Sequence, residues 1–139
     1  MIKNVLLIDD DDVTLMICRL RLKKSNFCEN VFTALNGEEA VQFLEDQLLL
    51  PLDKQHLPDL IFLDLNMPVM DGWTFMDIYE SRFKILMPTH AKIDILSSTV
   101  DPMDHERAKL YDSVRGFISK PLTEINLSEL KGIETSKKT

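Results

Sequence analysis

The sequence has few cysteines and no long apolar run. Its two thiols, Cys18 and Cys28, are too few for a disulfide framework and fit no zinc-site spacing, so we expect both to pack as small side chains. No stretch approaches the ~18 consecutive apolar residues that cross a bilayer, and the first residues lack the pattern of a secretory signal. The sequence therefore predicts a reduced, cytoplasmic protein with no membrane partner.

Basic residues are also in deficit, with 16 Lys and Arg against 23 Asp and Glu, which gives a net charge of −7. A nucleic-acid interface needs clustered Lys and Arg to neutralise phosphates, so no nucleic-acid partner is expected. The hydrophobic fraction of 45% and the charged fraction of 28% are typical of a folded globule and exclude a disordered chain. We expect residues 1–139 to form a single stand-alone domain.

Short apolar runs alternate with longer amphipathic segments along the chain. The runs that we expect to be strands lie at residues 5–8, 31–35, 60–63, 93–96 and 116–119. Helices are expected between them, the second beginning near Asn36 and the fourth near Asp101. Strands separated by helices predict an α/β fold, a five-stranded parallel sheet with helices on both faces.

Helical periodicity predicts which side chains face the core. In the first helix the apolar spacing i, i+3, i+4, i+7 selects Val13, Met16, Ile17 and Leu20 as the buried stripe. In the third helix it selects Phe75, Met76, Tyr79 and Phe83, with Trp73 as a partly buried anchor near the start.

Two regions interrupt this regular pattern. Residues 47–57 form an insertion between the second helix and the third strand, and its leucines predict either an extra helical turn or a contact surface. The last helix is expected over residues 124–133, followed by a loose tail at 135–139.

Polar side chains follow four of the predicted strands. Asp9 and Asp10 come after the first strand, Asp64 after the third, Ser97 after the fourth and Lys120 after the fifth. Because ligands bind beyond the carboxyl ends of parallel strands, we expect these side chains to meet at one edge. Two carboxylates ~4 Å apart repel by about 4 kcal/mol at an effective dielectric constant near 20, so the cluster needs a cation. Oxygen ligands favour Mg²⁺, and the three histidines have no zinc-site spacing.

Three segments resemble the response regulator receiver domain of two-component signalling. They are VLLIDDDD at the first strand, PDLIFLDLNMPVMDGW around the third strand, and GFISKP at the fifth. The resemblance covers nearly the whole chain and implies a CheY-like, flavodoxin-like doubly wound (βα)5 fold.

The resemblance implies a role for each strand-end residue. Asp64 would be the phosphoacceptor, Asp10 would bind Mg²⁺ directly, and Asp9 would act mainly through water or hydrogen bonds. The backbone carbonyl of Asn66 would be a further metal ligand, Mn²⁺ could replace Mg²⁺, and Lys120 would pair with Asp64 and then with the phosphoryl group.

It also implies a switch. Ser97 would bind the phosphoryl group, although Ser98 beside it offers a second hydroxyl, and Phe117 would be the switch aromatic. The bond between Lys120 and Pro121 would be a cis peptide.

Besides Ser98, which stands where alanine is commonest in the family, the chain departs from the family pattern in two places. Asp11 and Asp12 extend the acidic run, and we interpret them as loop and helix-start residues. The separation of Asp10 from Asp64 is longer than usual in the family, because of the insertion at 47–57. This insertion is expected on the edge opposite the acidic pocket.

The implied function is that of a regulatory phosphoprotein rather than an enzyme. A sensor histidine kinase or phosphotransfer protein would phosphorylate Asp64, and the signal would leave through contact with an unidentified downstream protein or a second copy of the chain. A haloacid-dehalogenase-type phosphohydrolase is one alternative, but it needs a second acid where Asn66 stands and a nucleophile on the first strand. A phosphate-independent interaction module is the other, but such modules usually lose an acid or the lysine.

Overall fold

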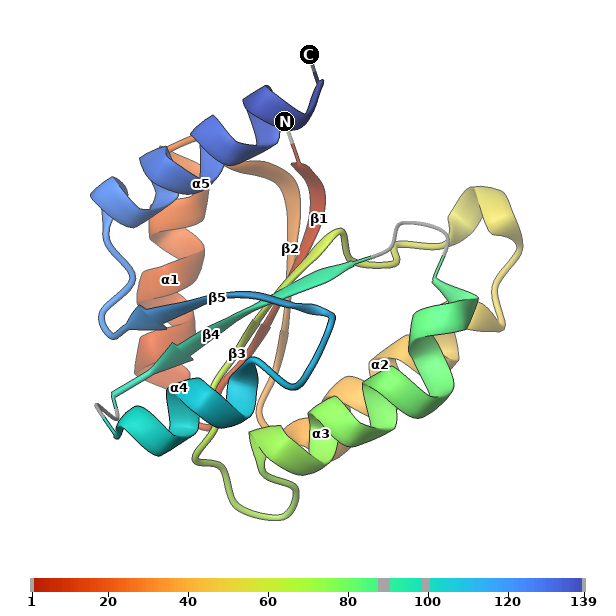
Figure 1. Ribbon diagram of the computed structural model, residues 1–139. Helices are drawn as coiled ribbons and strands as arrows, with labels where there is room; N and C mark the ends of the chain where they lie inside the picture. The colour runs from red at the N-terminus through yellow and green to blue at the C-terminus, as the bar shows by residue number, and fades with distance from the viewer. Residues whose placement is uncertain (1, 88–90, 99–100, 139) are drawn as a thin grey trace.

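Five parallel strands form one sheet at the centre of the protein (Figure 1). The computed structural model describes residues 2–87, 91–98 and 101–138, with side chains as far as residue 132. The strands are β1 (Ile2–Ile8), β2 (Cys28–Ala34), β3 (Leu60–Leu63), β4 (Lys92–Ser97) and β5 (Val114–Ser119). They are arranged in the order β2-β1-β3-β4-β5, and every neighbouring pair is parallel. This is the flavodoxin-like order, so the predicted fold class is confirmed.

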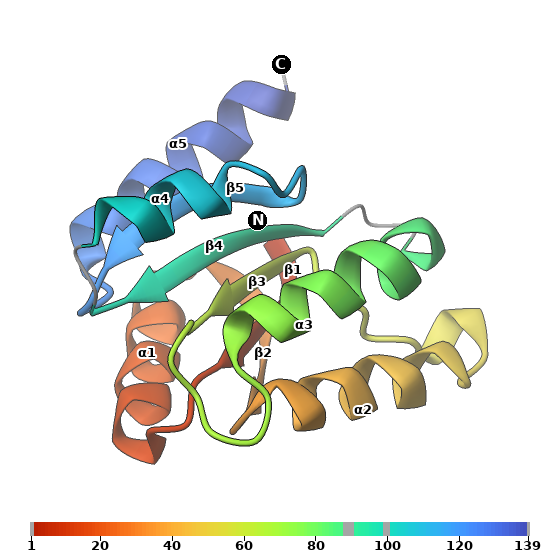
Figure 2. The ribbon, with the colours of Figure 1, turned by 60° about the horizontal axis from the view of Figure 1, so that its bottom comes forward.

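Helices cover both faces of the sheet (Figures 1 and 2). The α-helices are α1 (Asp12–Lys24), α2 (Gly37–Leu48), α3 (Gly72–Ile78), α4 (Pro102–Ala108) and α5 (Glu124–Lys138). α1 and α5 pack on one face, and α2, α3 and α4 pack on the other. α3 continues through a π-helical turn, η2 (Tyr79–Phe83), and a 3-10 turn, η3 (Lys84–Leu86).

The alternation of side chains along each strand divides the core into two layers. Leu6 and Ile8 of β1 pack with α2 and α3, whereas Val5 and Leu7 pack with α1 and α5. Since both faces are covered, these strands contain continuous apolar runs such as residues 5–8 and 60–63, which is the pattern that predicted them. The core stripe predicted for the third helix is confirmed, because all four of its side chains are buried, and Trp73 is half-buried beside them.

The stripe predicted for the first helix is wrong. Leu15, Cys18 and Leu22 face the core of the protein, whereas the predicted residues are 40–61% exposed. α1 carries apolar side chains around more than one face, so periodicity identifies a helix but does not select the side that packs on the sheet. We call the exposed residues Val13, Met16, Ile17 and Leu20 the α1 stripe.

The two irregular regions also differ from the expectation. The insertion does not extend the helix: α2 ends at Leu48, and a 3-10 turn, η1 (Leu52–Lys54), follows it. α5 continues to Lys138, through most of the segment expected as a loose tail, and no proline interrupts it. Residue 139 lies outside the described residues.

One charged pair lies inside the sheet. Asp94 of β4 is fully buried, and its carboxylate oxygens lie 2.7 Å from Nη2 and 3.4 Å from Nε of Arg115 on β5. Asp94 stands opposite Gly116, where a Cβ atom would come within 2.9 Å of the carboxylate. The missing side chain of Gly116 therefore provides the space that this ion pair occupies.

Both thiols are packed as predicted, and burial raises the pKa of each to about 11. Within the described ranges, none of the helices has the length and apolar character needed to span a membrane.

Candidate functional site

The carboxyl ends of β1 and β3, which are neighbours in the sheet, carry the acidic cluster. Asp9 and Asp64 continue the strand pairing by one residue, since the Asp9 amide donates to the Ala34 carbonyl and the Asp64 amide donates to the Ile8 carbonyl. Both carboxylates are buried, whereas Asp10 is exposed beside them. The topology therefore brings together acids that lie more than fifty residues apart in sequence.

These three carboxylates form a group that fits a divalent cation. One oxygen from each of Asp9, Asp10 and Asp64 lies within 4.8 Å of the others. The three acids line a cavity together with Asn66, whose backbone N–H donates to Asp64 Oδ1 at 3.3 Å. Hard oxygen donors with open access to water suit Mg²⁺ or Mn²⁺.

Lys120 supplies positive charge to this cluster. Its Nζ lies 2.6 Å from Asp9 Oδ2 and 3.5 Å from Asp64 Oδ2, as expected for a residue at the end of β5. Its backbone N–H donates to the Ser97 carbonyl, and the Lys120–Pro121 peptide bond is cis, as the resemblance implied. Burial opposes the charge on Lys120, but the hydrogen bond to Asp9 and the negative charge of Asp64 outweigh it and raise the pKa of the amine.

Asp64 titrates well above an ordinary carboxyl. Burial raises its pKa to about 6; the positive charge of Lys120 opposes this rise, and the nearby charges of Asp9 and Asp10 add to it. A bound cation stabilises the charged form of a carboxyl that burial disfavours in this way. This is a second reason to expect a metal at this site.

The cavity around the cluster is lined by polar residues. They are Asp9, Asp10, Asp11, Asp12, Asp64, Asn66, Ser98 and Lys120. Asp11 is the N-cap of α1, where it accepts hydrogen bonds from the Val13 amide and the Thr14 hydroxyl, and these bonds lower its pKa. Asp12 begins the helix. The expectation that Asp11 and Asp12 are loop and helix-start residues is confirmed.

The turn between β3 and α3 explains the Asp71-Gly72 pair in the sequence. A Cβ atom on Gly72 would lie 2.6 Å from the Asp64 carbonyl oxygen, so only glycine allows this close approach. The Gly72 amide donates to the Leu65 carbonyl, and the Asp71 side chain caps α3 by accepting from the Thr74 amide. The turn thus fixes the backbone immediately behind Asp64.

The two serines after β4 lie in different surroundings. Ser97 is the last residue of the strand and is fully buried, whereas Ser98 is exposed and lines the cavity. Thr99 lies outside the described residues. Strand register alone favoured Ser97, and it did not predict that Ser98 would face the cavity.

Phe117 lies in the middle of β5, half-buried against the core cluster of α2–α4. The ring of His105 on α4 stacks on it, with ring centroids 3.8 Å apart and an interplanar angle of 21°. Sequence reasoning missed this contact, because no spacing rule connects a residue on α4 with one on β5.

Comparison with known proteins identifies the family. Residues 5–131 match the response regulator receiver domain. A two-component response regulator of rice (Oryza sativa subsp. japonica) is 33% identical over 125 residues, covering 89% of this chain and 87% of the relative. A probable transcriptional regulator of Porphyra purpurea is 30% identical over 128 residues, and here the match covers 91% of this chain but only 54% of the relative.

A solved structure agrees with these matches. The two-component response regulator from Cytophaga hutchinsonii superposes with a TM-score of 0.84 at 29% identity, over 97% of this chain and 98% of the other. The matched residues include the acidic cluster, the lysine at the end of β5 and the turn after β3. The chain belongs to the response regulator receiver domain family of two-component signalling.

Proposed function

We propose that Asp64 accepts a phosphoryl group from a phosphohistidine on a sensor histidine kinase or phosphotransfer protein, in a reaction that depends on Mg²⁺. The observation that carries this proposal is the cluster of Asp9, Asp10 and Asp64 within 4.8 Å, with the Lys120 amine against two of its members. The membership in the receiver family supports the same reaction.

In the proposed reaction a carboxylate oxygen of Asp64 attacks the phosphorus atom. The P–N bond to the donor histidine breaks, its electron pair stays on the imidazole nitrogen, and that nitrogen takes up a proton. The transition state is loose, with charge on the phosphoryl oxygens, so the protein acts mainly by positioning and neutralisation. Lys120 neutralises part of this charge from one side. Asp9, Asp10, Asp64 and the Asn66 carbonyl would hold Mg²⁺, and a bound ion would supply further positive charge at the phosphoryl oxygens.

The acyl phosphate then alters the surface of the domain. A hydroxyl of the Ser97–Ser98 pair donates to a phosphoryl oxygen, and the backbone at the end of β4 follows it. Phe117 responds by leaving its stack on His105, which changes the face formed by α4 and β5. The stand-alone domain passes its signal on by contact with another protein. The reaction takes place in the cytoplasm, where the free thiols of Cys18 and Cys28 stay reduced.

Incubation with acetyl phosphate tests the proposal directly. We expect intact-mass spectrometry to show one added phosphoryl group when Mg²⁺ is present, and at least tenfold slower labelling after removal of Mg²⁺ with EDTA. A phosphate-independent module would take up no label. A haloacid-dehalogenase-type hydrolase would release phosphate continuously from a phosphomonoester, and either result would contradict the proposal.

The α1 stripe is the surface on which we expect the phosphodonor protein to dock. It begins at Val13, directly after the acidic residues that line the cavity, and all four of its aliphatic side chains are exposed. A small apolar surface suits a transient contact, which buries less than a stable interface does.

Changing Met16 and Leu20 to glutamate should therefore slow phosphoryl transfer from a protein donor but not from acetyl phosphate. We expect transfer from a phosphorylated histidine-phosphotransfer domain that labels the wild-type chain to slow at least tenfold, because the apolar contact is lost. Labelling by acetyl phosphate needs no docking and should stay within twofold of wild type. Ile125→Glu, on α5 at another exposed aliphatic residue, is the control and should change neither rate. Equal slowing with both donors would show that α1 acts on the chemistry and not on docking.

A further inference from the structure

A second group of exposed apolar residues lies near the amino ends of the strands, at the end of the sheet opposite the cavity. Leu49, Leu50 and Leu52 belong to the insertion after α2, and Ile85 and Leu86 belong to η3. Leu49, Leu52 and Ile85 are 85%, 83% and 89% exposed, which is more than any residue of the α1 stripe. We call these five residues the edge patch.

The two halves of the edge patch are neighbours. α2 and the helix formed by α3 and η2 run side by side in the same direction (Figures 1 and 2). An ion pair of 2.7 Å between Glu45 and Arg82 sets their relative position. Four residues after the members of this pair lie Leu49, the C-cap of α2, and Leu86, the last residue of η3. The two segments that carry the exposed side chains therefore lie at the same end of this pair of helices.

Hydrogen bonds hold the insertion in a defined shape. The Gln55 side-chain amide donates to the carbonyls of Leu48 and Leu50, and the His56 amide donates to the side-chain oxygen of Gln47. These bonds hold the backbone that carries the leucines, and a group of exposed apolar side chains is typical of an interaction site.

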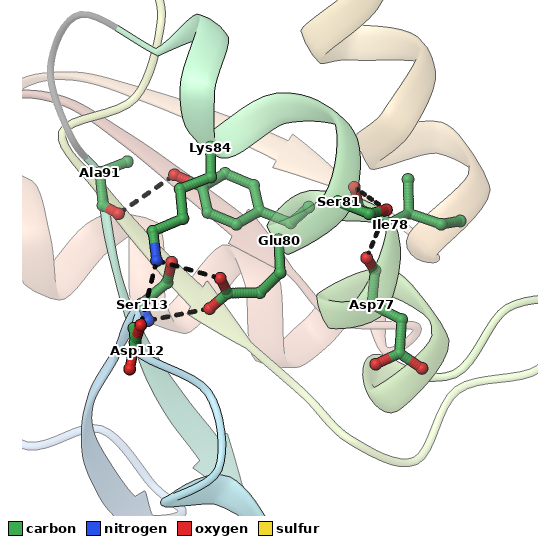
Figure 3. A network of polar contacts seen from close by, with 9 residues as sticks. Asp77, Ile78, Glu80, Ser81, Lys84, Ala91, Asp112 and Ser113 are labelled. Carbon is green, nitrogen blue, oxygen red and sulfur yellow. Dashed lines mark hydrogen bonds and ion pairs between the residues drawn. The ribbon is translucent and has the colours of Figure 1, made fainter.

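η3 is held just as firmly (Figure 3). Lys84 lies 3.2 Å from Glu80 and 3.5 Å from Asp112, and Glu80 also accepts a hydrogen bond from the Ser113 amide. These contacts join η2 and η3 to the start of β5. Ile85 follows directly after this anchored lysine, so its exposure does not come from a loose end of the helix.

Charges of both signs lie around the edge patch, although the whole chain carries −7. The basic residues are Lys54, Arg82 and Lys84, and the acidic residues are Glu45, Asp46, Asp53, Glu80 and Asp112. A surface with both signs can be complementary to itself, so two copies can approach here with less repulsion than two chains of net charge −7 meet elsewhere. A membrane surface or a nucleic acid would instead select a single sign.

We propose that the edge patch is the interface of a homodimer, in which two copies of this chain pack their insertions and η3 turns against each other. A two-fold axis brings the same patch of both copies together, with an apolar centre and a charged rim. Because the patch lies opposite the strand ends that carry the acidic cluster, the dimer leaves the cavity and the α1 stripe open. The association therefore does not depend on phosphorylation.

Sedimentation velocity of the full chain at concentrations up to hundreds of micromolar tests this proposal. We expect a concentration-dependent dimer, and we expect Leu52→Lys combined with Ile85→Lys to raise its dissociation constant about 30-fold or more, because charges replace the apolar centre. Leu110→Lys, between α4 and β5, and Leu20→Lys, on α1, are matched controls at exposed leucines and should leave the dimer intact.

All four changed side chains are exposed, so we expect every variant to keep its fold. Circular dichroism checks this expectation. Asp64→Asn should dimerise as wild type does, which separates this inference from the proposed phosphorylation. A wild-type chain that stays monomeric over the whole concentration range would overturn the proposal. So would a dimer that Leu110→Lys or Leu20→Lys disrupts while the edge-patch variant does not.

Discussion

Replacing Asp64 with asparagine is expected to abolish phosphoryl transfer to the protein from acetyl phosphate. The amide has nearly the same size and keeps the turn behind residue 64, but it lacks the anionic oxygen that would attack phosphorus. It also removes one of the three carboxylates of the cation site. Intact-mass spectrometry should show no added phosphoryl group within the time that labels the wild-type chain fully.

Asp12→Asn is the matched control for this experiment. Asp12 lines the same cavity and the substitution removes the same charge, but Asp12 is the first residue of α1 and not a member of the three-carboxylate cluster. We expect this variant to be labelled within about threefold of the wild-type rate. Undiminished labelling of Asp64→Asn would place the acceptor at another residue and would refute the assignment.

Asp64→Asn should also be more stable than wild type, so its loss of labelling cannot be ascribed to unfolding. Burial raises the pKa of Asp64 from 3.8 to about 6, so between these values the folded protein holds a proton that the unfolded chain has released. Ionisation of Asp64 therefore lowers the free energy of unfolding as pH rises through this window, and asparagine does not ionise. In urea unfolding without Mg²⁺ we expect Asp64→Asn to be about 1–3 kcal/mol more stable at pH 7, and close to wild type at pH 4.

The fold could be predicted from the sequence because local patterns determine most of it. Buried parallel strands read as apolar runs, so residues 60–63 were located without error, and the other strands were located apart from a few residues at their ends. The side of α1 that faces the sheet was predicted incorrectly, because Leu15 and Leu22 repeat with helical spacing just as Val13 and Leu20 do. Only tertiary packing decides between two such stripes.

The cluster could be predicted because topology brings strand ends together, whatever their distance in sequence. Asp9, Asp64 and Lys120 meet for that reason. The contacts of side chains between elements were not predictable in the same way, and the position of Ser98 in the cavity is one case. Asp94 is another: a single charge inside an apolar strand demands a partner, but nothing in the sequence identifies Arg115 as that partner.

The ion pair between Asp94 and Arg115 gives the second large expected effect. Replacing Asp94 with alanine should lower the free energy of unfolding by about 3–5 kcal/mol, because the guanidinium of Arg115 stays largely enclosed, at 12% exposure, without this carboxylate. Domains of this size have a total stability of only about 5–15 kcal/mol, so the variant should unfold at a much lower urea concentration. Urea titration followed by circular dichroism measures the difference.

A double-mutant cycle shows whether the loss comes from the pair itself. Arg115→Met leaves the buried carboxylate without this guanidinium and should cost a similar amount, whereas Asp94→Ala combined with Arg115→Met removes both charges. Since the double variant leaves neither charge of the pair without the other, it should lose clearly less than the two single losses added together. Additive losses would mean that the two side chains stabilise the sheet independently, through packing.

Asp59 provides a control that lies outside this pair. It precedes β3, and its carboxylate accepts hydrogen bonds from the Lys3 and Asn4 amides near the start of β1. Asp59→Ala combined with Arg115→Met should therefore give additive losses, which shows that any coupling belongs to the buried pair.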